Sequence, residues 1–458
     1  MRVLLVYPNT DRYLAPAPIG LAFLVPPLLE RGHDVSICDL MFENRPRKAL
    51  LSRLNGFRPH VVAFSIRNLD NQNMADPRTP LEGIKRLIHL AQQHGATTVL
   101  GGAAFSSLPC QMMDFLGADY GIVGQGEGSF SDLVDAVRTG ALDTGIPGLV
   151  RREDGRILAN PPDANGYGGK NPDWRPIYLS PYARRWHPGQ YPGAVVIKTG
   201  CRLRCSFCNS PFIAGSSYRL RSSDEILADI EHIVTTKRVR LFFFVDTCFN
   251  HPLPHAKAVL RAIVQSGIKI HFMSNLAPLK GAFDDELFFL YKKAGGLFIM
   301  LGADSLSPTM LGSYRKAFRY DDIVEFSRLA KRHRLPFGLS LIFGGPRETE
   351  ETIRESLLHL REIRYSLLFY NVGIRVLPHT ELFFATKEEG NNLTEDALLF
   401  PVFYLSPELD YGRAVQQIRQ GLRKYACRHV RMAPVAIRHI VARYVRVLSG
   451  QFQVISRD

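Results

Sequence analysis

Short apolar strands alternate with helices through the first 140 residues of this 458-residue chain. An apolar run that ends at a proline, such as residues 2–7 before Pro8, is typical of a buried parallel strand. Further strands are expected at Asp34–Cys38, His60–Ser65, Thr97–Leu100 and Asp119–Val123, with helices near Ile19–Arg31, Lys48–Gly56 and Leu81–His94 and a last helix to about Arg138. This order predicts a Rossmann-like, doubly wound α/β sheet, which binds ligands at the carboxyl ends of its strands.

The same alternation returns between residues 191 and 385 and predicts a partial (β/α) barrel of the TIM type. Its strands are expected at Val195–Lys198, Leu241–Val245, His271–Ser274, Leu297–Leu301, Pro336–Phe343 and Val372–Leu377. Residues 141–190 are expected to link the two domains, and residues 386–458 to form a helical, basic C-terminal region. The fold class predicted for the whole chain is therefore α/β.

Three cysteines lie in one short loop after the first expected barrel strand. Cys201, Cys205 and Cys208 are spaced i, i+4 and i+7, and clustered cysteine thiolates are how chains hold iron–sulfur clusters. Three thiolates leave one iron of a four-iron cluster open, and an open metal position is where chemistry occurs. A zinc site of four cysteines would need a second CxxC pair, and none follows. The loop predicts a 4Fe–4S cluster, with zinc binding or chance clustering as the weaker alternatives.

This loop, with Phe207 directly before the third cysteine, resembles the radical S-adenosylmethionine superfamily. In that superfamily the amino and carboxylate groups of S-adenosylmethionine chelate the open iron. An electron from the cluster then cleaves the sulfonium and gives a 5′-deoxyadenosyl radical. The cofactors carry this chemistry, and the protein binds them, orients them and excludes competing reactions.

The ends of the later barrel strands extend the resemblance. Gly302-Ala303-Asp304-Ser305 resembles the family's Gly-x-Glu-Ser, Gly344-Gly345-Pro346-Arg347-Glu348-Thr349 its Gly-x-Pro-x-Glu-Thr, and Pro378-His379-Thr380-Glu381-Leu382 its Pro-Gly-Thr-x-Leu. The resemblance implies an S-adenosylmethionine site formed by Phe207, Asp246, Asn275, Asp304, Ser305, Gly344, Gly345 and Leu377. The sequence departs from the family motifs at two positions. Asp304 is one methylene shorter than the family's acid, and His379 replaces a glycine. A turn or helix cap is the alternative role for Asp246, and a structural role is the alternative for His379.

The N-terminal half resembles the cobalamin-binding domain that precedes the radical domain in one large subfamily. The resemblance rests on Tyr7-Pro8, Pro18-Ile19-Gly20-Leu21, Gly101-Gly102 and Gly124-Gln125-Gly126-Glu127-Gly128. It implies a cobalamin site formed by Pro8, Ile19, Gly20, Ser65, Arg67, Asn68, Gly101, Gly102, Gly124, Gly126, Glu127 and Gly128. The Asp-x-His-x-x-Gly motif that supplies an axial histidine elsewhere is absent. Arg67 and Asn68 are therefore candidates for the side facing cobalt, with an ordinary polar loop as the alternative.

Together the resemblances cover residues 1–390 and imply a C-methyltransferase that acts on an unactivated carbon of a small-molecule or lipid-like substrate. One S-adenosylmethionine would methylate reduced cobalamin to methylcobalamin, and another would give the radical that removes a hydrogen from the substrate. Ring contraction or cyclisation without methyl transfer is one alternative, and a cobalamin sensor or a vestigial domain is another. Methylthiolation is disfavoured, because Cys38 and Cys110 cannot form the additional cysteine triad that it needs.

Charge and cysteine usage bear on partners and location. The net charge is +14, and after residue 412 ten lysines and arginines face a single acid, Asp458. Ile437, Ile440, Val441, Tyr444, Val445 and Leu448 share one helical face there, which predicts packing on the barrel or, alternatively, peripheral contact with an anionic membrane. No nucleic-acid-binding motif is present, and no nucleic acid is expected.

The expected protein partner is an electron donor such as flavodoxin or ferredoxin. The remaining cysteines are scattered, and no signal peptide or bilayer-spanning run is recognisable. Free buried thiols are typical of a reducing compartment, so the sequence predicts a cytoplasmic enzyme.

Overall fold

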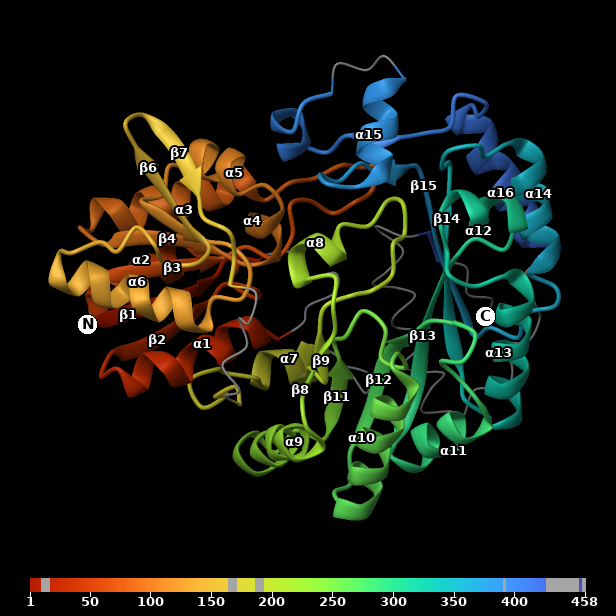
Figure 1. Cartoon of the computed structure of the whole chain (residues 1–458), viewed down its shortest axis with the longest axis horizontal. Helices are drawn as coiled ribbons and strands as arrows, with labels where there is room; N and C mark the ends of the chain where they lie inside the picture. The colour runs from red at the N-terminus through yellow and green to blue at the C-terminus, as the bar shows by residue number, and fades with distance from the viewer. Residues whose placement is uncertain (10–16, 164–170, 186–192, 390–392, 426–452, 455–458) are drawn as a thin grey trace.

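The computed structural model describes residues 1–9, 17–163, 171–185, 193–389, 393–425 and 453–454. It contains two seven-stranded sheets, one in each of two domains that lie side by side (Figure 1). Both sheets are mainly parallel and alternate with helices along the chain, so the predicted α/β fold class is confirmed.

The N-terminal sheet has the strand order β2-β1-β3-β4-β5-β6-β7. Its parallel strands are β1 (Arg2–Tyr7), β2 (Asp34–Asp39), β3 (Val61–Ser65), β4 (Thr97–Gly101) and β5 (Tyr120–Ile122). The helices are α1 (Ile19–Glu30), α2 (Pro46–Phe57), α3 (Leu81–Gln93), α4 (Ala103–Ser107), α5 (Pro109–Leu116) and α6 (Glu127–Thr139). Alternate residues of β1 enter two different cores, Val3 and Leu5 with α1 and α6, and Leu4 and Val6 with α2 and α3. The sheet is therefore covered on both faces.

Residues 141–190 are not the simple linker that the sequence predicts. They form β6 (Leu149–Glu153) and β7 (Arg156–Ala159), an antiparallel hairpin that extends the N-terminal sheet beyond β5. They also form α7 (Ser180–Arg185), and the side chain of Trp174 is fully buried. An edge hairpin of two short strands has no long apolar run, which is why the sequence pattern does not reveal it.

The second sheet has the order β18-β15-β14-β13-β12-β11-β8. Its parallel strands are β8 (Gly193–Val195), β11 (Leu241–Phe244), β12 (His271–Leu276), β13 (Gly296–Asp304), β14 (Phe337–Phe343) and β15 (Leu367–Val372), and β18 (Gln453–Val454) pairs antiparallel with β15. Helices α9 (Ser223–Lys237), α10 (Leu253–Ser266), α11 (Asp285–Lys293), α13 (Tyr320–Arg332) and α14 (Glu350–His359) line its outer side (Figure 1). Among the described strands no pairing joins the two edges, so the barrel is partial.

Several further elements complete the second domain. They are β9 (Lys198–Thr199), α8 (Ser210–Ala214), β10 (Arg219–Leu220), α12 (Pro308–Ser313), β16 (Ile374–Arg375), α15 (Glu381–Glu388), the 3-10 helix η1 (Asp396–Leu399), β17 (Phe403–Tyr404) and α16 (Tyr411–Tyr425). The apolar stripe predicted between Ile437 and Leu448 lies outside the described residues.

The expectation that Val372–Leu377 is a barrel strand is wrong. The sixth parallel strand is β15, which ends at Val372, where it pairs with Phe343 of β14. Gly373 follows with a φ of +84°, and this left-handed conformation ends the strand. The next residues form β16, which pairs antiparallel with β17. Leu377 therefore follows a short side ribbon and not a barrel strand.

The two domains share their hydrophobic cores. One buried cluster joins Leu21 of α1 to Trp174 and to Val195 of β8, and a second joins Val6 of β1 to Ile374 and Val376. A buried ion pair also crosses the boundary, where Arg375 Nε donates to Asp70 Oδ2 over 2.6 Å and the two side chains are 3% and 1% exposed. The arrangement of the domains is thus fixed by packing and by charge.

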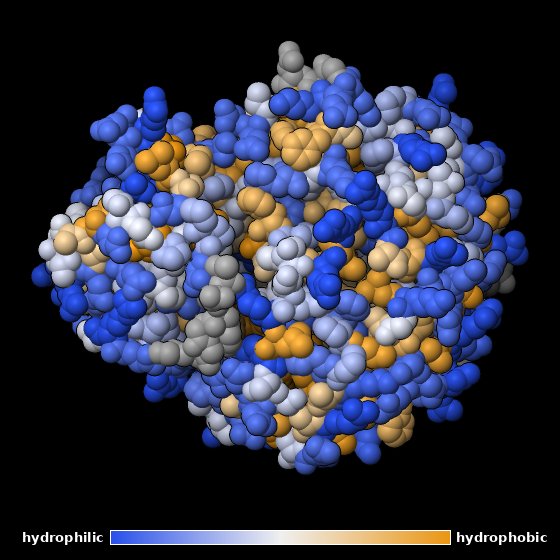
Figure 2. Space-filling model, viewed as in Figure 1, coloured by the Kyte–Doolittle hydropathy of each residue, from blue (hydrophilic) through white to orange (hydrophobic). Residues whose placement is uncertain are grey.

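No helix in the described part of the chain is long and apolar enough to cross a bilayer. On the face drawn in Figure 2, hydrophobic residues form separate patches between polar ones.

Candidate active site

The cysteine loop runs between β9 and α8 at the carboxyl end of the second sheet. Gly200 has a φ of +88°, and a Cβ there would lie 1.9 Å from the carbonyl oxygen of Ser217, so only glycine fits. The Cys201 N–H donates to the Gly215 carbonyl over 2.9 Å, and the Cys208 N–H donates to the Cys205 carbonyl over 3.1 Å. The backbone therefore folds the loop into a compact turn before any cofactor is added.

Hydrogen-bond donors surround two of the three sulfurs. Lys316 Nζ lies 3.6 Å from Cys205 Sγ, and the Ser210 N–H lies 3.5 Å from Cys208 Sγ. Burial raises the pKa of the Cys205 thiol to about 11, while the charge of Lys316 opposes that rise. Donors and a cation at sulfur stabilise thiolate ligands.

A four-iron cluster fits this donor set. No three His, Cys, Asp or Glu groups among the described residues converge on one metal ion. A four-iron cluster does not require such convergence, since each cysteine binds a different iron. The loop thus offers three separate cysteine ligands, two of them with supporting donors.

Lys316 is a site residue that the sequence prediction lacks. Its Nζ donates to Asp304 Oδ2 over 2.5 Å, and its side chain is only 6% exposed. Burial lowers the pKa of Lys316, but the charges of Asp304 and Cys205 and the hydrogen bonds to both together outweigh burial, and the pKa is raised overall. Asp304 itself has a φ of +64°. Because twelve residues separate the two partners, no local motif signals their contact.

Asp246 and Asn275, two residues predicted to bind S-adenosylmethionine, lie together. The buried Asp246 carboxylate accepts the Lys198 N–H over 3.0 Å, and Asn275 Nδ2 donates to the Asp246 carbonyl over 3.2 Å. Burial raises the pKa of Asp246, and the charge of Lys198 opposes this. Ser305 is also buried, and its hydroxyl lies 3.3 Å from that of Ser356. The carboxylate of Asp246 thus orders the strand ends that carry the predicted site.

Gly344 and Gly345 form a tight turn after β14. Gly344 has a φ of +95°, and a Cβ on Gly345 would lie 2.2 Å from the ring of Tyr314. The buried Glu348 carboxylate accepts both glycine N–H groups, over 2.6 and 3.3 Å. Burial raises the pKa of Glu348 to about 7, and these two N–H groups lower it. Packing and turn geometry therefore account for both glycines.

Phe207 connects this turn to the cysteine loop. Its ring meets the Tyr314 ring edge-on with centroids 5.4 Å apart. Leu377 is half-buried and packs against the same hydrophobic cluster. His379 adopts a φ of +61° and stacks on Phe212 of α8 at 3.7 Å. The left-handed backbone is the conformation that the family's glycine would favour at this position.

The residues predicted for cobalamin lie at or near the carboxyl ends of β1, β3, β4 and β5 and at the starts of α1 and α6. Gln125 Oε1 and Glu127 Oε2 are buried and have no hydrogen-bond partner within the described structure. A Cβ on Gly20 or on Gly128 would meet no atom within 4 Å. Burial raises the pKa of Glu127 to about 7. Open space and unpaired oxygen acceptors fit cobalamin, whose rim carries amide N–H donors.

The remaining predicted cobalamin residues differ in burial, and packing accounts for Gly102. Gly102 has a φ of +97°, and a Cβ there would lie 2.5 Å from the carbonyl oxygen of Ile66. Ser65 and Asn68 are half-buried, Arg67 is exposed, and Pro8 is buried. Half-buried residues of the set are also Ile19, Gly101, Gly124 and Gly126.

A polar cluster at the ends of β1 and β2 was not predicted. Tyr182 donates its hydroxyl hydrogen to Asp39 Oδ2 over 2.6 Å, and Asn9 Nδ2 donates to the Tyr7 hydroxyl over 3.2 Å. Burial raises the pKa of Tyr7, and the charge of Arg67 opposes this rise. The cluster brings α7 of residues 141–190 to the carboxyl edge of the first sheet.

A buried hydrogen bond joins the two predicted cofactor sites. Asn209, directly after Cys208, donates through Nδ2 to Ser107 Oγ of α4 over 3.0 Å. The neighbouring Ser106 hydroxyl accepts the Gly124 N–H over 3.0 Å. The cysteine loop therefore abuts the same sheet edge that carries Gly102 and Gly124.

Two family models match the two domains. One described as the radical SAM superfamily matches residues 195–360, and one described as the B12 binding domain matches residues 10–134. The chain belongs to the cobalamin-dependent radical S-adenosylmethionine enzymes. The enzyme uses a 4Fe–4S cluster, S-adenosylmethionine and cobalamin, as the sequence predicts.

Relatives of this radical S-adenosylmethionine enzyme cover most of its length. Tryptophan 2-C-methyltransferase of Streptomyces laurentii is 26% identical over 430 residues, which span 80% of this chain and 71% of the relative. Hopanoid C-3 methylase of Methylococcus capsulatus is 26% identical over 380 residues, spanning 79% and 69%. The anaerobic magnesium-protoporphyrin IX monomethyl ester cyclase of Synechocystis is 22% identical over 373 residues, spanning 79% and 71%.

A solved structure supports the fold of the enzyme over nearly its whole length. It is the radical S-adenosylmethionine methyltransferase TsrM from Kitasatospora setae, with cobalamin and a [4Fe-4S] cluster bound. The TM-score is 0.81 at 23% identity, and the match covers 92% of this chain and 90% of that one.

Proposed function

We propose that this enzyme transfers a methyl group to an unactivated carbon of a small-molecule substrate. The observation that carries the proposal is the buried hydrogen bond between Asn209 and Ser107. It holds the cysteine loop against the sheet edge that the predicted cobalamin residues occupy. Methyl transfer between two cofactors requires such an arrangement, in which the substrate lies between them.

When bound, S-adenosylmethionine and cobalamin supply the methyl group, and the cluster supplies the electron for radical formation. The chain contributes the rest of the site. Cys201, Cys205 and Cys208 would hold the cluster, and Lys316 would place positive charge beside it. Gln125 and Glu127 would accept hydrogen bonds from cobalamin amides. The apolar cores shared by the domains exclude water from the boundary, which protects a reactive carbon radical.

The named relatives favour methyl transfer and leave the substrate open. Two of them are C-methyltransferases or methylases that act on unlike molecules, tryptophan and hopanoids. The cyclase relative supports ring formation without methyl transfer as the second candidate. We infer a small-molecule substrate whose shape the sequence motifs do not specify.

We also propose a reducing cytoplasm as the location and a flavodoxin or ferredoxin as the electron donor. All six cysteines that the structure describes are free thiols, and Cys38, Cys201 and Cys248 are buried. Free thiols persist in reducing compartments. The enzyme's net charge of +14 suits association with an acidic redox protein.

The test uses full-length protein reconstituted anaerobically with iron, sulfide and hydroxocobalamin. It is supplied with a reductant, methyl-deuterated S-adenosylmethionine and a small-molecule extract of the source cells. We expect the label in the cobalamin fraction and in at least one new product, together with bound cluster and cobalamin. The Cys205→Ala variant should lose the cluster spectrum, while Cys110→Ala, which alters a half-buried cysteine outside the loop, should keep it.

Two outcomes would reject methyl transfer. Formation of 5′-deoxyadenosine with a new but unlabelled product would favour cyclisation. A reconstituted protein that holds the cluster but no cobalamin would show that the N-terminal domain does not serve this chemistry.

A further inference from the structure

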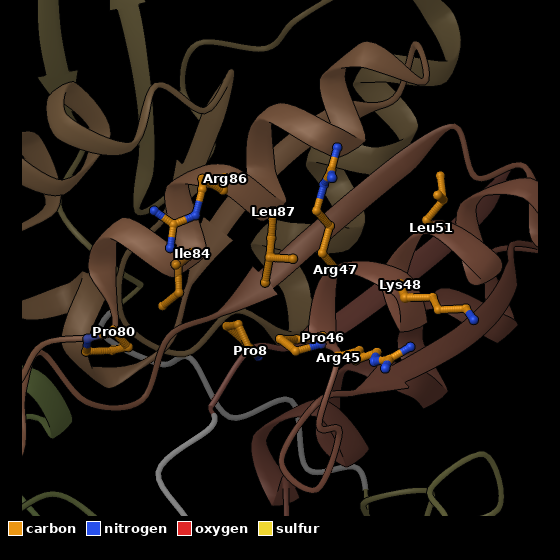
Figure 3. Close-up of a pocket in the computed structure, with 11 residues that line it drawn as sticks. Pro8, Arg45, Pro46, Arg47, Lys48, Leu51, Pro80, Ile84, Arg86 and Leu87 are labelled. Carbon is orange, nitrogen blue, oxygen red and sulfur yellow. The ribbon is translucent and has the colours of Figure 1, made fainter.

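A pocket of about 520 Å³ lies at the carboxyl edge of the first sheet, where the first turns of α2 and α3 meet the end of β1. It is lined by Pro8, Arg45, Pro46, Arg47, Lys48, Leu51, Pro80, Gly83, Ile84, Arg86 and Leu87. Figure 3 shows Leu87, Pro8 and Pro46 in the middle, with Ile84 and Arg86 to one side and Arg45 and Lys48 to the other. The pocket therefore combines an apolar floor with a cationic rim.

The four rim cations, Arg45, Arg47, Lys48 and Arg86, lack partners. Their side chains are exposed and make no hydrogen bond or ion pair with any residue that the structure describes. None of the lining residues is acidic. Elsewhere in the chain, exposed cations are often paired, as Arg31 is with Asp132. The rim is thus a concentration of uncompensated positive charge around a concave apolar surface.

Three of these cations stand where a helix disfavours them. Arg45 is the N-cap of α2, Arg47 and Lys48 lie in its first turn, and that turn contains no acid. The N-terminus of a helix carries partial positive charge, so each cation there destabilises the helix. A bound anion would relieve this repulsion. Residues that oppose the local structure, with no compensating contact inside the fold, are typical of functional positions.

The pocket lies beside the predicted cobalamin site and shares one residue with it, Pro8. The cobalamin residues Ile19, Gly20, Glu127 and Gly128 belong to α1 and α6, which cover one face of the sheet. The pocket lies between α2 and α3, which cover the opposite face. Pro8 is the only residue that both lines the pocket and belongs to the predicted cobalamin set.

We propose that this pocket binds a small molecule that carries a phosphate group on a short apolar body. Arginine guanidinium groups bind phosphate oxygens in pairs of parallel hydrogen bonds, and the proline and leucine floor covers the apolar part. Such a group could belong to a free phosphorylated molecule or to the nucleotide phosphate of cobalamin. We assign it to a free molecule, because only Pro8 of the predicted cobalamin residues lines the pocket. The proposal does not depend on methyl transfer.

Hexyl phosphate, inorganic phosphate and hexanol are the probes, titrated by calorimetry into cobalamin-loaded and cobalamin-free full-length protein at low salt. We expect hexyl phosphate to bind both forms, and to bind at least tenfold more tightly than either of the other two. The Arg47→Gln/Lys48→Gln variant should lose at least tenfold in that affinity. It should also unfold at a higher temperature than the parent when no ligand is present, because the repulsion at α2 is removed.

The matched control is Arg328→Gln/Lys331→Gln on α13. These two exposed cations lie towards the C-terminal end of their helix, where the dipole favours positive charge. The control should bind hexyl phosphate as the parent does and should gain no thermal stability.

Three results would overturn the proposal. Equal affinity of the parent and the Arg47/Lys48 variant would place binding elsewhere. Loss of hexyl phosphate binding on cobalamin loading would assign the pocket to the cofactor's own phosphate. Equal affinity for inorganic and hexyl phosphate would show that the apolar floor takes no part.

Discussion

The ammonium group of Lys316 lies between a predicted cluster ligand and a carboxylate, 3.6 Å from Cys205 Sγ and 2.5 Å from Asp304 Oδ2. A reduced cluster is more negative than an oxidised one, so a nearby cation favours reduction and a nearby anion opposes it. Lys316 would therefore favour reduction of the cluster, and Asp304 would oppose it. Burial strengthens the electrostatic effects of both charges, because water screens buried charges little.

We expect Lys316→Met to lower the reduction potential of the cluster and Asp304→Asn to raise it. The first change removes the cation at sulfur, and the second leaves that cation uncompensated. Potentiometric titration followed by electron paramagnetic resonance measures both shifts. Lys257→Met is the control, since Lys257 pairs with Asp284 and Glu286 in a contact that involves no cysteine. Shifts of the same sign in the first two variants would contradict this account.

Glu127 gives the cobalamin-free enzyme a pH dependence. Its pKa is raised from 4.5 to about 7, mainly by burial. A carboxyl group with a higher pKa in the folded state binds its proton more tightly there. Its contribution to stability is complete below about pH 4.5 and is lost as the pH rises through about 7. Other buried acids such as Glu348 act in the same window, so a variant is needed to isolate Glu127.

We expect Glu127→Gln to reduce the loss of thermal stability between pH 5.5 and pH 8.5. The reason is that the neutral amide cannot ionise. Thermal unfolding followed by circular dichroism at each pH measures the change in stability. Glu82→Gln, on the exposed first turn of α3, should leave the pH profile unchanged. A profile for Glu127→Gln that matches the parent would show that Glu127 is hydrated and not buried.

At the scale of elements, the loop after β3 is fixed to the second domain. Asp70 accepts from Arg375 of β16, and the other guanidinium nitrogens donate to the carbonyls of Val376 and Leu398. A Cβ on Gly373 would lie 2.3 Å from Met74 Sδ, so the same loop also packs against the end of β15. Arg67 and Asn68 stand at the start of this loop. The ion pair therefore holds the residues that are candidates for facing cobalt.

Replacing Arg375 by methionine should lower the free energy of unfolding by about 3–5 kcal/mol, because it leaves a buried carboxylate unpaired. Chemical denaturation measures this loss. The double variant Asp70→Asn/Arg375→Met should recover part of it, since no charge then stays buried alone. As a control, Arg354→Ala breaks an exposed pair with Glu351 and should cost less than about 1 kcal/mol. No recovery in the double variant would mean that the arginine acts through packing and not through charge.

Elements with a strong local pattern could be predicted from the sequence. The buried run before Pro8 gave β1, and Ser222 with Glu225 forms the capping box that begins α9. The sixth barrel strand was misplaced by five residues, because the apolar run continues through Gly373 and only the φ of that glycine marks the break. Lys316, Tyr182 and Arg375 could not be predicted as site or boundary residues. Each acts through a partner distant in sequence, and a single sequence shows no such pairing.

At the scale of the whole molecule, the shared cores predict that the two domains unfold as one cooperative unit. Each of the two large buried clusters contains residues from both domains. Neither domain can therefore unfold without exposing part of the other's core. We expect calorimetry of the cofactor-free enzyme to show a single unfolding transition, with a calorimetric enthalpy equal to the van't Hoff enthalpy. Two resolved transitions would show that the shared clusters contribute little to stability.

The hydrogen bond from Asn209 to Ser107 would also couple the loading of the two cofactors. Metal bonds to the three cysteines would rigidify the folded cysteine loop further, and that loop supports the edge on which cobalamin would rest. Thermodynamic reciprocity then requires that whatever factor the cluster adds to cobalamin affinity, cobalamin adds to retention of the cluster. Damage by oxygen would accordingly spread from one cofactor to the other, and the enzyme would gain or lose its two cofactors together.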